Sequence, residues 1–284
     1  MTDNYSRVGN RYHLLPKNEA NILLRYIWLD GNGHDLRTKS MRSYREPQTV
    51  DEVPLCAYCG QTCGHMKLTA NSDCWLKPVL LCDDPFRQHN HKLVFCVPIK
   101  YQIEASIYRH SCEAIERQLN ASKRPLLVIR QPYILYSKKT GKPIGWPFGN
   151  FDAMDRTSNY GVGTNVANGR DINEAFYRAC LYAGLTLSAS QVEDMPSMWS
   201  FELGPTRGTG IADQLWMARY ILQYISEEFD CIVSLNPLKH KQTDGQYLRV
   251  WAGDQISVQP QLYPMNSDPY LAVKTICQSL LGGN

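Results

Sequence analysis

The sequence lacks a strong net charge and long apolar runs, and each absence excludes a class of partner. Lysine and arginine exceed aspartate and glutamate by only three, 30 against 27 in 284 residues, whereas nucleic-acid-binding proteins concentrate basic residues on one face. No stretch approaches the run of about 20 apolar residues that a membrane-spanning helix requires. We therefore expect this chain to bind neither nucleic acid nor membranes.

The first twenty residues, MTDNYSRVGNRYHLLPKNEA, also lack the apolar core of a secretory signal. We therefore predict an intracellular, cytoplasmic protein. This prediction bears on the ten cysteines, which are many for a chain of this size, because disulfides are rare in the reducing cytosol. We interpret most of these cysteines as small buried hydrophobic residues.

One group of cysteines permits a second interpretation. In the segment CAYCGQTCGH, Cys56, Cys59, Cys63 and His65 fall within ten residues, and loop-forming glycines separate them. Thiolate and imidazole ligands on a tight turn suit a tetrahedral zinc ion. A structural zinc site usually draws its remaining ligands from a second pair, however, and no neighbouring cysteines have that spacing. The sequence favours free thiols here and leaves zinc as the alternative.

The first hundred residues have the pattern of a β-sheet. RYIWLDGNGHDLRTKSMRSY alternates apolar and polar residues on either side of Asp30-Gly31, which is typical of two strands joined by a hairpin turn. An apolar strand is predicted from Leu93 to Val97, and we place a domain boundary near Lys100.

The remaining sequence alternates helical and strand patterns. Apolar residues recur at helical spacing in residues 104–119, 172–183 and 211–229. Gly184 is expected to end the second of these helices. Between the second and the third, MPSMWSFELGP alternates as a strand does, with Trp199, Phe201 and Leu203 on one face.

The segment from Tyr160 to Trp216 carries a family resemblance. It contains YGVGTNVANGRDINEAFYRACLYAGL and SQVEDMPSMWSFELGP, and it resembles the catalytic core of the eukaryotic-type glutamine synthetases. The resemblance implies an α+β fold: a β-grasp-like domain over residues 1–100, then a truncated catalytic domain, an antiparallel sheet with flanking helices, over residues 101–284. It also implies an oligomeric ancestor, because the family's small domain closes over the active site of the neighbouring subunit.

The resemblance fails after Asn236-Pro237 and returns only in the terminal NSDPYLAVKTICQSLL. A long internal segment of the family is therefore expected to be missing between about Tyr247 and Gln261. In the family, that segment carries the arginines that bind glutamate and phosphate, together with another metal-binding carboxylate.

Glutamine synthetases join glutamate and ammonia with ATP at paired divalent metals, which require carboxylate oxygens. By the resemblance, two metal-binding glutamates are replaced by Arg130 and Pro132, and a third by Ser200. Arg130 places a positive charge where a cation should bind, so it repels the metal. Glu193 matches a metal ligand that is retained. Most of the metal site is therefore expected to be lost.

The ammonia site is expected to be incomplete for the same reason. Cys59 stands where the family has the first ammonia-binding aspartate, and Asp73 aligns with the second. Asp73 is equally well explained as a capping or turn residue.

Three hypotheses follow. The leading one is a catalytically inactive glutamine synthetase-like protein, with no cofactor, that serves as a binding partner, scaffold or oligomer-forming subunit, alone or with another protein. The second is a residual glutamate–ammonia ligase that binds ATP and Mg²⁺ or Mn²⁺ through Glu193, Glu202 and Asp73. The third is a zinc-stabilised interaction module built on Cys56, Cys59, Cys63 and His65.

Overall fold

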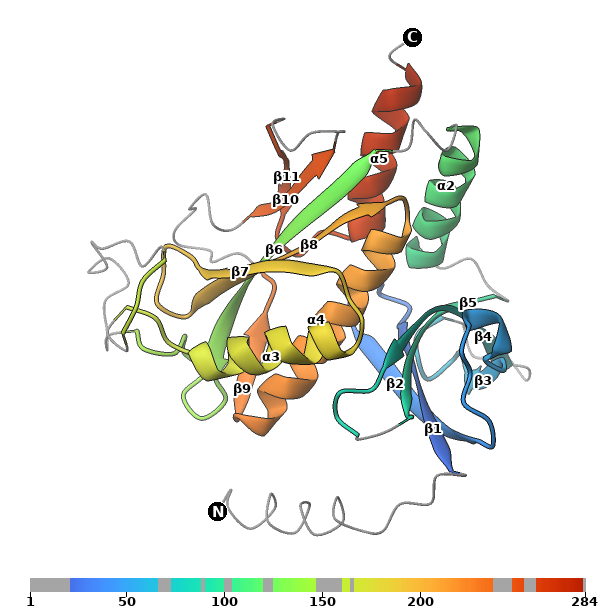
Figure 1. Cartoon of the computed structure of the whole chain (residues 1–284), viewed down its shortest axis with the longest axis horizontal. Coiled ribbons are helices and arrows are strands. Elements are labelled where there is room, and N and C mark those ends of the chain that lie inside the picture. The colour runs from blue at the N-terminus through green and yellow to red at the C-terminus, as the bar shows by residue number, and fades with distance from the viewer. Residues whose placement is uncertain are drawn as a thin grey trace.

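The chain folds into two β-sheets and four described helices, as the computed structural model in Figure 1 shows. The structure describes residues 21–65, 73–87, 90–99, 104–119, 125–146, 160–163, 166–236, 247–252 and 259–282. The predicted α+β fold class is confirmed. Within the described part of the chain, no helix is long and apolar enough to cross a membrane.

The first sheet contains five strands in the order β2-β1-β5-β4-β3. The strands are β1 (Ile22–Leu29), β2 (Leu36–Ser43), β3 (Cys56–Cys59), β4 (Asp73–Asp83) and β5 (Lys92–Pro98), and the 3-10 helix η1 (Val50–Glu52) precedes β3. The β1–β5 pair is parallel and the other pairs are antiparallel. The predicted hairpin is confirmed as β1 and β2, although residues 30–35 connect them in place of a two-residue turn.

The second sheet is antiparallel, with the order β11-β10-β6-β8-β7, and β9 also pairs with β6. Its strands are β6 (Leu126–Ser137), β7 (Leu187–Val192), β8 (Met198–Arg207), β9 (Cys231–Ser234), β10 (Tyr247–Ala252) and β11 (Gln261–Pro264). The helices are α2 (Glu104–Gln118), α3 (Arg170–Tyr182), α4 (Gly210–Glu228) and α5 (Pro269–Gly282). The three predicted helices and the β8 strand are thus confirmed, with ends shifted by one to three residues.

The main hydrophobic core lies between the second sheet and its helices. Trp199, Phe201 and Leu203 of β8 all point into this core, as their alternation predicts. The long helix α4 also packs against β4 and β5 of the first sheet. At this contact Arg25 of β1 donates a hydrogen bond of 2.9 Å to the Tyr220 hydroxyl of α4. Helix α4 therefore joins the two sheets.

Two expectations about organisation have different outcomes. Residues 247–252, at the start of the region where a family segment is expected to be missing, form β10, which pairs with residues 127–130 of β6. The boundary expected near Lys100 lies outside the described residues. The division into residues 1–100 and 101–284 therefore stays a prediction.

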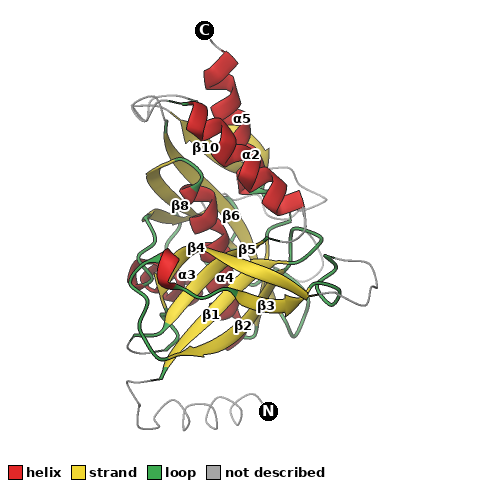
Figure 2. Cartoon of the chain, turned by 90° about the vertical axis from the view of Figure 1, so that its right-hand side faces the viewer, coloured by secondary structure: helices red, strands yellow, loops and turns green. Residues whose placement is uncertain are grey.

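A buried ionic network ties three helices together. Arg109 of α2 donates two hydrogen bonds to the Asp213 carboxylate of α4, at 2.9 and 2.8 Å, and the Tyr270 hydroxyl of α5 donates a third. Figure 2 shows α2 and α5 side by side at this point. A buried carboxylate needs such partners, because burial without them is strongly unfavourable.

Replacing Arg109 should therefore destabilise the protein far more than replacing an exposed arginine of the same helix. We expect Arg109→Met to lower the free energy of unfolding by about 3–5 kcal/mol, because it leaves the Asp213 carboxylate buried without its cation. Arg117, whose side chain is 79% exposed, supplies the control Arg117→Met, with an effect of less than about 0.5 kcal/mol. Urea unfolding measures both, and equal effects would contradict this account.

Candidate functional site

Three residues that the resemblance assigns to the metal site meet on one face of the second sheet. Arg130 of β6 donates a hydrogen bond of 3.0 Å from Nε to Oγ of Ser200 on β8. Its Nη2 donates a second, of 2.5 Å, to Oε1 of Glu193, directly after β7. The sequence therefore brings together the substituted positions 130 and 200 and the retained glutamate.

Burial makes this contact a substantial ion pair. Only 12% of the Arg130 side chain and 6% of the Glu193 side chain are exposed. A carboxylate in such surroundings requires a cation or several hydrogen-bond donors. In this chain the guanidinium supplies both, so Glu193 is neutralised by the protein itself.

The residues at this site do not fit a divalent metal ion. Metal-binding sites for Mg²⁺ or Mn²⁺ need several carboxylate or carbonyl oxygens, and here Glu193 is paired with an arginine and Ser200 offers a hydroxyl that already accepts a bond. Within the described residues, no group of three or more histidine, cysteine, aspartate or glutamate side chains is placed to hold a metal ion.

Glu202 does not replace the missing ligand at position 200. It lies two residues further along β8 and stands opposite Arg130 in the β6–β8 pair. Two residues along a strand correspond to about 6.6 Å, which is more than twice the length of a metal–oxygen bond of about 2.0–2.6 Å. Glu202 therefore adds negative charge beside Arg130 at a different position from the lost carboxylate.

Pro132 lies opposite Ser200 in the same strand pair. On one side β8 pairs with β6 without a register shift at this point. On the other side β10 ends its pairing at residue 130 and β9 begins at residue 134. The proline is accommodated because it falls in the gap between these two neighbours.

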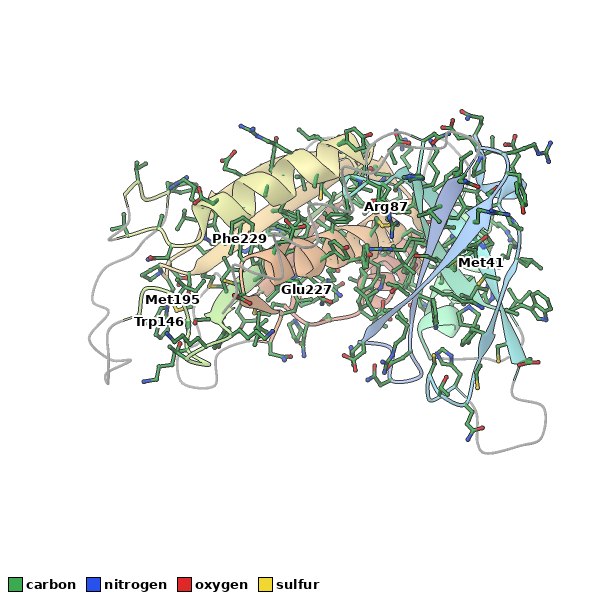
Figure 3. The ribbon with its side chains drawn as sticks, turned by 90° about the horizontal axis from the view of Figure 1, so that it is seen from below. Met41, Arg87, Trp146, Met195, Glu227 and Phe229 are labelled. Carbon is green, nitrogen blue, oxygen red and sulfur yellow. The ribbon has the colours of Figure 1, made fainter. Side chains whose placement is uncertain are left out.

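The turn that carries Glu193 is held by a small apolar cluster. Met195, Met198, Ile134 and Met265 are buried together, and Trp146 packs against them. Figure 3 shows Trp146 and Met195 at the same end of the molecule. The Glu193 amide also donates to the Met198 carbonyl at 2.9 Å. These contacts fix the carboxylate within reach of Arg130.

Sequence reasoning missed the group that anchors the opposite face of β6. The side-chain carbonyl of buried Gln131 accepts two hydrogen bonds from Arg219 of α4, at 3.0 and 2.5 Å. Burial lowers the pKa of Arg219 to about 10, so it stays protonated at neutral pH. The signal in the sequence is an arginine within the apolar helix 211–229, and the contact fixes β6 so that Arg130 points away from the helices.

The two positions that the resemblance assigns to the ammonia site, Cys59 and Asp73, lie in the first sheet. Cys59 ends β3 and Asp73 begins β4, and the two residues stand opposite each other. Arg130 and Ser200 belong to the second sheet.

The structure also does not assemble the cysteine cluster into a zinc site. Cys56 and Cys59 are three residues apart on β3, so their side chains point to opposite faces of the sheet. Cys56 is buried in the core beneath the sheet, where Cys63 also packs, and Nδ1 of His65 is hydrogen-bonded to the Tyr58 hydroxyl at 2.6 Å. Burial lowers the pKa of His65. Zinc binding stays an untested prediction without support from this geometry.

Comparison with known proteins gives the family. No family model matches the chain. The chain is 40% identical to glutamine synthetase of Rattus norvegicus over 81% of its own length and 61% of the relative. It is 37% identical to the Xenopus laevis enzyme, over 81% and 58%. The chain belongs to the glutamine synthetase family. It spans about 60% of the length of the curated relatives it matches.

Two further comparisons agree with this glutamine synthetase assignment. The relative named glutamine synthetase 2 cytoplasmic, of Drosophila melanogaster, is 39% identical over 80% of this chain and 62% of its own length. A solved structure titled "GmaS/ADP complex-Conformation 1" shares the fold, with a TM-score of 0.61 and 12% identity over 88% of this chain and 55% of that one. The predicted family resemblance is confirmed.

A double-mutant cycle tests the ion pair at this glutamine synthetase remnant. We expect Arg130→Met to lower the free energy of unfolding by about 3–5 kcal/mol, because Glu193 keeps its charge without a cation. Adding Glu193→Met should recover most of that loss, because an apolar pair of similar volume replaces a buried ion pair at little cost. Urea unfolding of the four proteins measures the coupling, and strictly additive losses would show that the two side chains do not interact.

Proposed function

We propose that this chain is a catalytically inactive glutamine synthetase-like protein that serves as a binding, scaffold or oligomer-forming subunit. The observation that carries the proposal is the contact of Arg130 with both Glu193 and Ser200. Substitution has removed metal ligands and has also installed a permanent positive charge among the ones that remain.

Simple electrostatics indicates the size of the effect. Two unit charges 4 Å apart interact by about 4 kcal/mol at an effective dielectric constant of about 20. A divalent ion at that distance from the Arg130 guanidinium would thus be repelled by about 8 kcal/mol. The same ion would also have to displace the guanidinium from Glu193. Both contributions oppose metal binding at this position.

Loss of the metals bears directly on the family's reaction. Phosphoryl transfer from ATP depends on metal ions that position and neutralise the phosphate oxygens. Residual ligase activity through Glu193, Glu202 and Asp73 would depend on Glu193, which is already paired with Arg130. Groups that act as one unit lose their effect together when several are removed. An inactive protein is therefore favoured.

Titration of the purified chain tests the loss of catalysis. We expect no binding heat with ATP and Mg²⁺ or Mn²⁺, and no phosphate release when glutamate and ammonia are added. The variant Arg130→Glu/Pro132→Glu/Ser200→Glu, which restores the carboxylates, should gain measurable Mn²⁺ binding by calorimetry or electron paramagnetic resonance.

The control for this gain is the same variant with Glu193→Gln added, which should bind Mn²⁺ more weakly. Circular dichroism and thermal unfolding show whether the restored variant is folded. The measurement on the wild-type chain decides the question on its own. Turnover by the wild type would overturn the proposal and support a residual ligase. Stoichiometric Mn²⁺ binding that Glu193→Gln abolishes would do the same.

The proposed oligomeric role is supported by an apolar patch on the first sheet. Leu55, Trp75 and Ile99 are each 46% exposed. Trp75 stands opposite Ala57 of β3, and its carbonyl accepts a hydrogen bond of 3.1 Å from the Ile99 amide. Leu55 precedes Ala57 by two residues and lies on the same face. Adjacent exposed apolar side chains mark protein contacts, and the family resemblance implies a neighbouring copy in the cytoplasm.

Charge at the centre of this patch should break the assembly. We expect the full chain to sediment as an oligomer and Trp75→Glu to shift it towards the monomer, because a carboxylate is costly to bury in an apolar contact. Leu181, 49% exposed on α3, supplies the matched control Leu181→Glu, which should leave the assembly unchanged. Sedimentation velocity measures both, and a monomeric wild type would refute self-association.

A further inference from the structure

Strand β2 leaves one edge of the first sheet open. Its eight residues pair with β1 along their full length, and among the described residues no strand pairs with its other side. An open edge presents a row of backbone N–H and C=O groups that an extended chain can pair with. All of the β2 side chains are exposed or half-buried, so the edge is reachable.

The open edge is positively charged. Arg37, Lys39 and Arg42 lie on β2, and Arg45 follows it. Arg37 forms an ion pair with Asp30 at 3.1 Å. Lys39 instead donates to the Ala57 carbonyl at 2.7 Å, and the Arg42 guanidinium lies 4.4 Å from the centre of the Tyr44 ring.

Three of these four cations have no acidic partner of their own. Within the described part of the chain, Lys39, Arg42 and Arg45 form no ion pair. Charge complementarity therefore favours an acidic segment along this edge.

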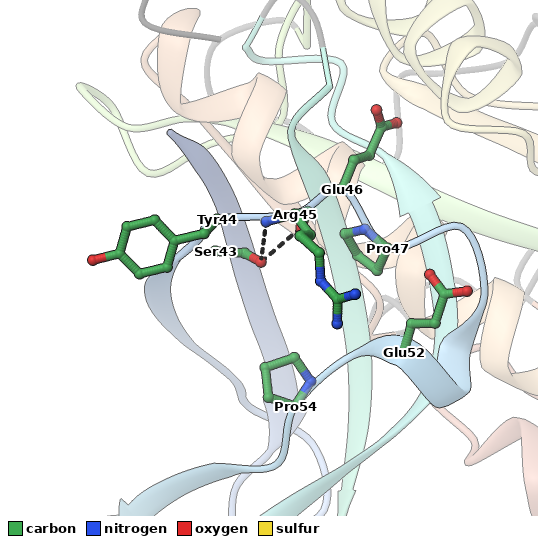
Figure 4. A pocket seen from close by; sticks show the side chains of 7 residues that line it. All are labelled: Ser43, Tyr44, Arg45, Glu46, Pro47, Glu52 and Pro54. Atoms are coloured by element: carbon green, nitrogen blue, oxygen red, sulfur yellow. Dashed lines mark hydrogen bonds between the residues drawn. The ribbon is translucent and has the colours of Figure 1, made fainter. Parts of the chain in front are cut away.

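A pocket continues the edge at the end of β2. Its volume is about 490 Å³, and it is lined by Ser43, Tyr44, Arg45, Glu46, Pro47, Glu52 and Pro54. Figure 4 shows the Arg45 side chain pointing into the space between the two prolines. Glu46 is already paired with Lys92 at 2.9 Å. The pocket thus offers apolar proline walls and a guanidinium at the point where a strand beside β2 would end.

We propose that the open edge of β2 and this pocket form a docking site for an extended acidic segment of a partner protein. The segment adds to the sheet as a further strand, with carboxylates beside Lys39 on one face and beside Arg42 on the other, and one side chain enters the pocket. The inference rests on the binding role proposed above, but it does not depend on the loss of catalysis.

A second copy of this chain does not fit the same edge. Two β2 strands in an in-register antiparallel pair would bring Arg37 opposite Arg42, and like charges in facing positions destabilise a strand pair. Cations on an edge strand also discourage self-association in general. The occupant is therefore acidic.

Fluorescence polarisation of the full chain tests this site with a defined probe. The probe is a labelled eight-residue peptide in which pairs of glutamates alternate with valine–threonine pairs, so that both faces of the added strand carry carboxylates. The matched control peptide has the same sequence with alternate backbone amides N-methylated, which removes the hydrogen-bond donors of one edge and keeps the charge. The control peptide is made in two forms, one for each set of alternate amides, because only one edge of the peptide strand pairs with β2.

We expect the unmodified peptide to bind, and methylation of one set of amides to weaken binding at least tenfold. Lys39→Glu/Arg42→Glu should weaken binding at least tenfold, and Arg45→Ala should weaken it several-fold. Arg178→Glu, a charge reversal at an exposed position of α3, should leave binding unchanged. Arg42→Ala serves as a milder variant if the double reversal does not fold.

Three outcomes would overturn the proposal. Equal binding of the methylated and unmodified peptides would show that charge alone attracts the probe. Absence of binding would show that the cations only prevent other strands from pairing with this edge. Tighter binding of a single-stranded oligonucleotide than of the peptide would point to nucleic acid. None of these results bears on the metal titration or on the Trp75 variant, so failure here is distinguishable from failure of the proposed function.

Discussion

The retained Glu193 carboxylate is buried, and this single constraint organises the site around it. A buried carboxylate must be neutralised or hydrogen-bonded, and in a metal-dependent enzyme the metal ion does this. Here the Arg130 guanidinium contacts both Glu193 and Ser200. Glu193 is therefore neutralised within the protein.

Because side chains alternate along β6, neighbouring residues of this strand point into two different environments. Arg130 points to the face that carries Glu193, and Gln131 points to the helices, where it accepts two hydrogen bonds from Arg219. A slip of one residue would exchange these faces and bury Arg130 in the apolar core. The Gln131–Arg219 contact thus specifies the register that the ion pair requires, although it lies on the opposite side of the sheet.

Local sequence patterns predicted the helices and strands well, but they did not predict the contacts between residues that are far apart in the sequence. The period of 3.6 residues located α3 and α4, and the alternation of β8 identified Trp199 as a core residue. Strand β10 was not predicted, because it lies where the family resemblance fails. The Arg130–Glu193 bond joins residues 63 positions apart, and residue types showed only that a cation stood in a metal site. The spacing of the cysteine cluster left zinc as the alternative to free thiols, and the two-residue period of β3 separates Cys56 from Cys59.

The two surfaces proposed as contact sites differ in character. The patch around Trp75 is apolar and suits a permanent protein–protein interface, because such interfaces are stabilised mainly by removing apolar area from water. The edge of β2 is cationic and offers backbone groups, which suits an exchangeable acidic segment whose affinity falls with salt. The two surfaces are neighbours, because Lys39 of β2 donates a hydrogen bond of 2.7 Å to the carbonyl of Ala57, which stands opposite Trp75. A contact at the patch therefore also affects the access of an extended segment to β2.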